Sequence, residues 1–228
     1  MAADRRSALT FLVLATILGA CASGIYPALQ EPYHKAVFQN SCINVYDVRL
    51  LPGQHSFFHI HTHDQLGIVL QDAEAFNQEF GADERLQQAR AGSISYIPHS
   101  TSSGYTHRIR VTGQNAFRVI GVEFTKKAPP GAVAASAGPD QAPPLFAQGA
   151  ITRVKLSPGA PLALERSLII AETPSELAAG DKAWTLSAGA VRWVDKDTTA
   201  SSKATSTLLI LKLSDTAACA ADPKQGKQ

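Results

Sequence analysis

The stretch Pro52–Asp72, PGQHSFFHIHTHDQLGIVLQD, is the most informative part of this chain. It holds four of the seven histidines within nine residues, and His59, His61 and His63 occupy alternate positions. Side chains of a β-strand alternate between its two faces, so these three imidazoles are expected on one face. Imidazoles that converge on one face suit a divalent transition metal, whereas a polar strand edge with solvated histidines is the simpler alternative.

Apolar runs on both sides of this stretch predict short strands. INVYDVRLL, residues 43–51, precedes the Pro52-Gly53 turn, and LGIVL, residues 66–70, follows the histidines. ISYI at 94–97 and FRVIGVEF at 117–124 continue the pattern, with turn residues between the runs. No segment shows helical periodicity over any length, so we expect an all-β fold, either a barrel or a sandwich.

The composition limits the size of the core and the kinds of partner. With 228 residues and 45% hydrophobic content, the chain can bury one sizeable core or two small ones. The formal net charge is +2, and no block of like charge occurs. We therefore expect no nucleic-acid partner and no polybasic membrane patch.

Residues 1–22 are interpreted as an export signal. Arg5-Arg6 precede the apolar run LTFLVLATILGA, which is too short to span a bilayer. The ending Leu18-Gly19-Ala20-Cys21 resembles the bacterial lipobox, whose cysteine becomes lipidated. The sequence therefore predicts an exported, periplasmic protein. It is a lipoprotein anchored through Cys21 in one interpretation and simply cleaved near Ala20 in the other.

The remaining chain is expected to divide into two units. A tether (23–35), an N-terminal unit (36–125), a Pro/Ala/Gly-rich linker (126–149), a C-terminal unit (150–214) and a tail (215–228) follow the signal. The linker is predicted from KKAPPGAVAASAGPDQAPP, a composition that does not favour a packed core.

The C-terminal unit repeats the N-terminal one. VYDVRLLPG (45–53) corresponds to ITRVKLSPG (151–159), and AGSISYIP (91–98) corresponds to AGAVRWVD (188–195). Such matches in the same order indicate a duplicated β-unit. In this alignment Glu165 and Ser167 stand where the first copy has His59 and His61, and no histidine follows residue 107. The chemistry is therefore expected in the first copy.

Three cysteines are present, at positions 21, 42 and 219. If Cys21 is lipidated or removed, Cys42 and Cys219 are the only intramolecular pair that can form a disulfide in an oxidising periplasm. Two free thiols are the alternative, because the sequence does not give the distance between them.

Two spaced motifs resemble those of the cupin superfamily. In the first, Gly53 is followed by five residues, His59-Ile60-His61, three residues and Gln65, where cupins have a glutamate. In the second, Gly92 is followed by five residues and Pro98, and an insertion then precedes Gly104-Tyr-Thr-His107. The resemblance covers the first unit strongly and the second as a degenerate copy.

This resemblance implies a cupin-type jelly-roll β-barrel with two cupin units in one chain, a bicupin. Carried over position by position, the metal ligands would be His59, His61 and His107, with Gln65 in the place of the glutamate. The cofactor implied is a divalent transition metal, with iron as the first choice and manganese, nickel, copper or zinc as alternatives. Cupins often form dimers, so a homodimer is a further expectation.

Gln65 offers a neutral carbonyl oxygen where the family has a carboxylate. Three neutral histidines would leave the full 2+ charge on the metal, which favours anionic, chelating substrates. This arrangement resembles cupin dioxygenases that act on thiols and diketones, so an oxygenase acting on a small chelating molecule is the first hypothesis. A periplasmic cupin that binds a ligand or a metal without turnover is the second, and a cupin isomerase or lyase is the third.

His63 and Tyr105 are the candidate catalytic residues. His63 has the parity of the ligands but lies beyond the motif pair, where it would act as a base, and Tyr105 lies on the inserted loop beside the third ligand. A solvated histidine and a plain loop are the simpler alternatives. His34 and His55 are expected at the surface, and Asp64 is expected to face away from the site.

Overall fold

The structure is a computed structural model that describes residues 24–99, 103–214 and 219. The expected export signal, with Cys21, and most of the expected tail lie outside the described residues. Apart from one short 3-10 helix, every regular element described is a β-strand. Within the described ranges, no helix is long and apolar enough to cross a membrane.

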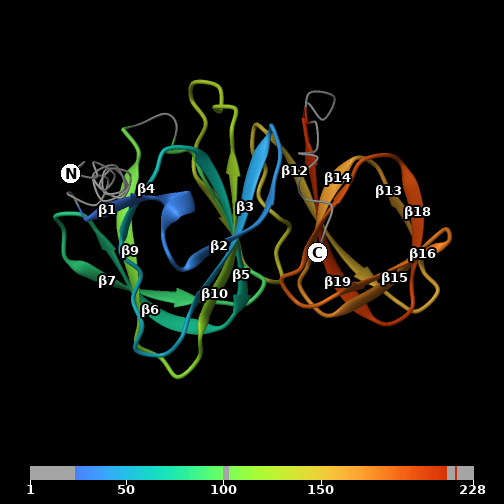
Figure 1. Ribbon diagram of the computed structural model, residues 1–228, viewed down its shortest axis with the longest axis horizontal. Coiled ribbons are helices and arrows are strands. Elements are labelled where there is room, and N and C mark those ends of the chain that lie inside the picture. The colour runs from blue at the N-terminus through green and yellow to red at the C-terminus, as the bar shows by residue number, and fades with distance from the viewer. Residues whose placement is uncertain (1–23, 100–102, 215–218, 220–228) are drawn as a thin grey trace, which may run out of the picture.

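The first unit is a barrel made of two sheets (Figure 1). One sheet has the strand order β1-β4-β9-β6-β7, and the other has the order β11-β8-β5-β10-β3-β2. The bounds are β1 Ile25–Pro27, η2 Ala28–Gln30, β2 His34–Gln39, β3 Ile43–Leu50, β4 Phe58–His61, β5 Asp64–Gln71, β6 Ala73–Glu79, β7 Glu84–Ala89, β8 Ile94–Ile97, β9 Tyr105–Val111, β10 Phe117–Phe124 and β11 Ala135–Ala137.

The second unit lies beside the first and repeats its strand order (Figure 1). Its sheets have the orders β12-β19-β14-β17 and β13-β18-β15-β16, which match β3-β10-β5-β8 and β4-β9-β6-β7. The bounds are β12 Gly149–Leu156, β13 Pro161–Leu164, β14 Ser167–Ala171, β15 Ser175–Ala179, β16 Lys182–Leu186, β17 Val191–Val194, β18 Thr198–Ser202 and β19 Ser206–Leu213. The predicted all-β fold of two units is confirmed.

Glycine turns explain why the repeat is visible in the sequence. Gly53 and Gly159 end the two Pro-Gly turns with φ angles of 80° and 78°. Gly92 and Gly189 precede β8 and β17, each with a φ angle of 81°. Only glycine adopts this region without strain, so both units need glycine at these turns, and the repeat is easiest to see there.

The predicted alignment of the histidine strand with Glu165 and Ser167 is wrong. β13 is the counterpart of β4, and its inward side chains are Leu162 and Leu164, which belong to the core of the second barrel. The connection between the Pro-Gly turn and the strand is shorter in the second unit, so equal spacing from the turn overshoots the strand. Leucines therefore occupy the inward positions of the strand that carries histidines in the first unit.

The six-stranded sheet is buried on both faces. Its inner face contributes Tyr46, Val48 and Leu50 to the interior of the first barrel. Its outer face packs against the β12-β19-β14-β17 sheet, where Leu168 and Leu209 meet Ile68, Ile120 and other residues in one shared core. Double burial explains why the strands β3 and β10 have few exposed positions.

Three segments expected to be irregular contribute to the packing. The predicted tether forms β1, which pairs in parallel with β4, so it is part of the barrel rather than a free arm. The predicted linker contains β11, which pairs with β8. Part of the predicted tail is also fixed, because Cys219 forms a disulfide with Cys42, with a Cα–Cα distance of 5.3 Å.

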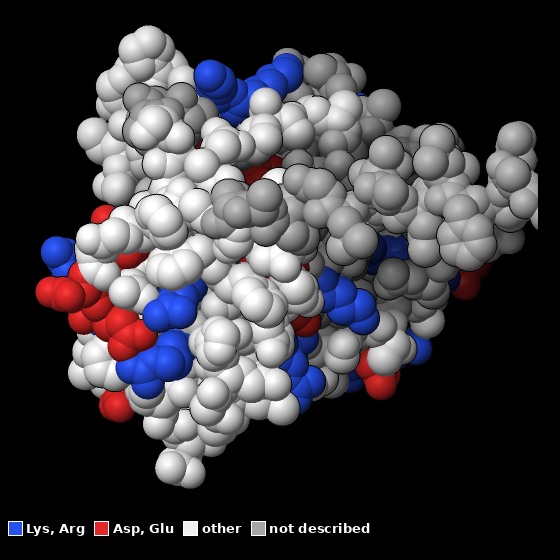
Figure 2. Space-filling model, turned by 60° about the vertical axis from the view of Figure 1, so that its left-hand side comes forward, with Lys and Arg blue, Asp and Glu red and all other residues white. Residues whose placement is uncertain are grey.

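Charges of both signs are interspersed on the surface. On the face shown in Figure 2, Lys and Arg atoms lie beside Asp and Glu atoms, and the described residues there form no continuous basic field. Protein surfaces that bind nucleic acid gather Lys and Arg on one face. This face lacks that footprint.

Candidate metal centre

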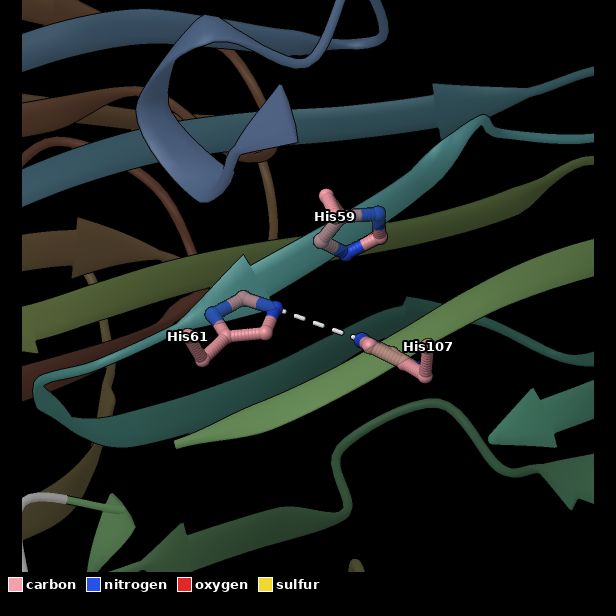
Figure 3. A group of neighbouring side chains, drawn as sticks. All are labelled: His59, His61 and His107. Carbon is pink, nitrogen blue, oxygen red and sulfur yellow. Dashed lines mark hydrogen bonds between the residues drawn. The ribbon is translucent and has the colours of Figure 1, made fainter. Parts of the chain in front are cut away.

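Three histidines meet inside the first barrel (Figure 3). His59 and His61 lie on β4, and His107 lies directly opposite His59 on β9. One ring nitrogen of each lies within 4.8 Å of one ring nitrogen of the other two. His59 and His61 are each 1% exposed, so these two rings are shielded from bulk water, whereas His107 is partly exposed.

The outer ring nitrogen of each histidine is held by an acceptor. Nδ1 of His59 lies 2.9 Å from the carbonyl oxygen of Phe57. Nδ1 of His61 lies 2.9 Å from Oε1 of Glu123, and Nδ1 of His107 lies 2.9 Å from Oδ1 of Asn77. An acceptor at Nδ1 assigns the proton to that nitrogen, so the lone pair of each Nε2 is left for the centre of the cluster.

This donor set fits a divalent transition metal. Nε2 of His61 and Nε2 of His107 are 3.2 Å apart, and two lone pairs at that distance repel unless a cation or a proton lies between them. Burial lowers the pKa of His59 and of His61 to about 4, and it lowers the pKa of His107 well below its usual range. The three imidazoles are therefore uncharged at neutral pH, which is the form that binds a metal.

Glu123 is a site residue that the sequence analysis missed. It lies on β10, is 2% exposed, and accepts the His61 hydrogen bond. Burial raises the pKa of Glu123 to about 7, while the nearby His63 opposes that shift. A carboxylate behind a metal-binding histidine orients the ring and makes it a stronger ligand. An acidic residue inside the apolar run FRVIGVEF was the available indication.

Gln65 lines the same cavity and is the cross-strand partner of Glu123. Its side-chain amide donates to the hydroxyl of Tyr46 over 2.8 Å. The Tyr46 ring in turn stacks on His34, with centroids 4.7 Å apart. The polar wall beside the histidines is therefore fixed by neighbouring side chains, and the role of Gln65 as a metal ligand stays a prediction.

The prediction that His34 lies at the surface is wrong. His34 is 7% exposed and lines the cavity, with its ring 4.5 Å from that of His59. Its Nδ1 bonds the carbonyl oxygen of Ala28 over 2.7 Å, because the N-terminal segment folds onto the barrel. Burial lowers its pKa to about 3. His55 is exposed, as predicted.

The two candidate catalytic residues have different settings. The Tyr105 ring lies in the cavity wall, 5.3 Å from the ring of His99 and 4.6 Å from that of His107. Its hydroxyl accepts a hydrogen bond from Asn77, and burial raises its pKa, so the hydroxyl stays protonated. The side chain of His63 is 40% exposed, and its Nδ1 lies 3.9 Å from Oε2 of Glu123.

The cavity has a volume of about 530 Å³ and two chemically different parts. Five of the seven histidines of the chain are in its wall. Asp64 faces away from it, as predicted, and accepts a hydrogen bond from the backbone N–H of Ala128. The polar lining consists of His34, His59, His61, His99, His107, Tyr46, Ser56, Gln65, Asn77, Gln87, Ser95 and Tyr105, and the apolar lining includes Val48, Leu50, Val69, Ile109, Phe117 and Val119.

The metal-free protein should lose stability as the pH falls from 6.5 towards 4. The lowered histidine pKa values mean that the unfolded chain binds more protons than the folded one in this window. Glu123 acts with the opposite sign between pH 4.5 and 7, because its folded-state pKa is raised. The four histidines outnumber this one glutamate, so their contribution sets the direction of the stability change. The melting temperature measured after chelation should be lower at pH 5 than at pH 7, and an equal or higher value at pH 5 would contradict this.

Replacing Glu123 by glutamine should weaken metal binding by roughly 10- to 100-fold, because the acceptor behind His61 loses its charge. The measurement is a competition titration of the metal against a chromophoric chelator. Glu74→Gln removes a charge from an exposed position and is the matched control. An unchanged metal affinity in Glu123→Gln would show that the carboxylate does not act through His61.

No family model matches this sequence, and no curated protein matches it. Solved structures do match. The nickel(II) complex of the bacterial pirin YhhW from Escherichia coli has a TM-score of 0.56 at 13% identity, over 79% of this chain and 84% of that one. AerE from Microcystis aeruginosa has a TM-score of 0.55 at 12% identity, over 81% of this chain and 99% of that one.

YhaK from Escherichia coli is a third similar structure, with a TM-score of 0.53 at 14% identity, over 78% of this chain and 87% of that one. At such identities the likeness concerns the fold alone. The strand order, the duplicated unit and these neighbours agree with the motifs at Gly53 and Gly92. The chain therefore has the cupin fold, with two cupin units in one polypeptide.

Proposed function

We propose that the protein is a metal-dependent enzyme of the oxygenase type, acting on a small chelating organic molecule inside the first barrel. The observation that carries the proposal is the convergence of the ring nitrogens of His59, His61 and His107, whose Nδ1 atoms each lie 2.9 Å from an acceptor. His59, His61 and His107 would hold the metal. When bound, a divalent metal supplies Lewis-acid and redox chemistry at this point.

The protein's own residues would bind and orient the substrate. Three neutral ligands leave the metal's charge uncompensated in a site of low dielectric, which favours an anionic chelating group. Tyr105 keeps its proton and can donate a hydrogen bond to such a group, while Asn77 holds the tyrosine in place. His63, partly exposed beside Glu123, is the group through which a proton could pass to solvent.

The test of this proposal begins with the metal content of the mature chain. We expect about one divalent metal per chain in the wild type and none in the His59→Ala/His61→Ala double variant, because two of three ligands are gone. His55→Ala, at an exposed position, is the matched control. Iron is the first metal to reconstitute, and nickel is the second, since the similar protein YhhW was solved with nickel(II).

Oxygen consumption with diketones and thiols then tests turnover. We expect consumption by the metal-loaded wild type and its loss in His107→Ala. A loaded protein that binds chelators without consuming oxygen would support a non-catalytic binding cupin instead, or a lyase or isomerase if the ligand is transformed. A chain that takes up no metal after reconstitution would contradict the proposal as a whole.

We also propose that the protein is exported and anchored through Cys21. The Cys42–Cys219 disulfide supports export, since such bonds persist in oxidising compartments. The full chain should fractionate with membranes after expression in a bacterium. The Cys21→Ser variant should lack the lipid and should leave the membrane fraction. Recovery of the wild type in the cytosol, with both thiols free, would contradict export.

A further inference from the structure

The two units of this chain provide an internal comparison of a barrel with a cavity and a barrel without a described one. A row of four residues crosses the inner face of each equivalent sheet, from the counterpart of β3 to the counterpart of β8. The rows are Tyr46–Gly121–Gly67–Ser95 in the first unit and Thr152–Ile210–Ile169–Arg192 in the second.

The sequence and the strand register support this equivalence independently. Tyr46 and Thr152 each stand seven residues before the glycine of their Pro-Gly turn. Ser95 and Arg192 each stand three residues after the glycine that precedes their strand. The cross-strand pair Gly67–Gly121 in one unit is therefore the pair Ile169–Ile210 in the other.

The isoleucine pair fills the second barrel. Ile169 is fully buried in a core that includes Leu162 and Leu164, and Ile210 packs against that core. The interior of a β-strand disfavours glycine, so the cross-strand pair Gly67–Gly121 needs a structural explanation. Neither Gly67 nor Gly121 has a positive φ angle, so the backbone conformation does not supply it.

The two glycines of the first unit serve different purposes. A side chain at Gly121 would overlap the ring of Tyr46, so this glycine makes room for the tyrosine that supports His34 and Gln65. Gly67 instead opens onto the cavity, and an added Cβ there would lie 3.1 Å from Oγ of Ser95 and 3.9 Å from Val119. Gly67 therefore lines the cavity without a side chain, and a larger residue there would press against Ser95 and take up volume next to the site.

Apolar side chains make up much of the wall around this volume, together with the hydroxyl of Ser95, and the polar groups of the same cavity include five histidines. Val69 and Val119 flank Gly67, and Leu50 and Phe117 lie further along the same sheet. A ligand that fills the cavity must present polar atoms at one end and apolar surface at the other, because burying unpaired polar atoms against these walls is costly.

We propose that Gly67 and Ser95 form the floor of an apolar subsite, and that the substrate is a metal-chelating head group joined to a compact apolar body, such as a short alkyl chain or a single ring. The chelating end rests on the proposed function, and the apolar end rests on the cavity itself. Small, wholly hydrophilic acids would leave this subsite unfilled.

Two hydroxamic acids test the subsite on the metal-loaded protein, because they share one chelating head and differ only in their apolar body. Hexanohydroxamate should bind the wild type on the order of 100-fold more tightly than acetohydroxamate, since each buried methylene contributes about fourfold. Gly67→Val should reduce this ratio to a few-fold. Its metal content and its affinity for acetohydroxamate should stay as in the wild type.

Gly138→Val is the matched control, because an added Cβ there would meet only Gln141, at 3.6 Å. Gly67→Ala, a smaller change, replaces Gly67→Val if the valine variant does not fold. Equal affinity of the wild type for the two hydroxamates would overturn the proposal. So would a Gly67→Val protein that retains the full wild-type ratio.

A second measurement separates this proposal from the proposed function. Cyclohexanol has no chelating head, and it should raise the melting temperature of the metal-free wild type but not that of metal-free Gly67→Val. If the chain takes up no metal, the proposed function fails while this measurement still decides the apolar subsite. If metal binds but cyclohexanol stabilises both proteins equally or neither, the subsite is refuted and the metal centre stands.

Discussion

Burial of the six-stranded sheet on both faces is the constraint on which the rest of the structure depends. The outer face of β3, β5, β8 and β10 shares a hydrophobic core with the second unit, and the inner face lines the first barrel. Strand alternation separates these tasks residue by residue. Ile120 and Val122 hold the two units together, whereas Gly121 and Glu123, between and beside them, serve the cavity.

The site depends on this support because its imidazoles are held in place by hydrogen bonds to protein groups. Each ligand ring is fixed from behind by a different partner: a backbone carbonyl for His59, a carboxylate for His61 and an amide oxygen for His107. Two of these partners are neutral, and the third is the carboxyl group of Glu123, whose pKa burial raises to about 7. Since Gln65 lies directly across from Glu123, the acidic group of this part of the barrel lies behind His61 rather than at the position of Gln65.

Local pattern was enough to predict the apolar strands, the turns and the grouping of the histidines on one face, but not the polar strands β6 and β7. His59 and His61 are close in sequence, and glycine turns mark Gly53 and Gly92, so short-range rules apply to them. The supporting residues could not be found in this way. Glu123 lies 62 residues from His61, and Asn77 lies 30 residues from His107, so only the strand register brings them together. The burial of His34 could not be predicted for a related reason. The Pro-containing segment 23–35 gives no sign in its sequence that it will form β1 and pair with β4.

Glu165 and Ser167 do not correspond to His59 and His61, because the connection between the Pro-Gly turn and the next strand is shorter in the second unit. Once the ladders define the equivalences, the second unit shows how a barrel of the same strand order packs its interior with apolar side chains. Its inward positions are filled with isoleucine and leucine, each contributing roughly 1.5–3 kcal/mol by burial. The first unit forgoes that stabilisation at Gly67 and surrounds the space with buried imidazoles that also cost desolvation. A filled barrel packed against the outer face of the same sheet offsets such a loss. The degenerate copy thus has a physical role, since its core stabilises the sheet from which the cavity is built.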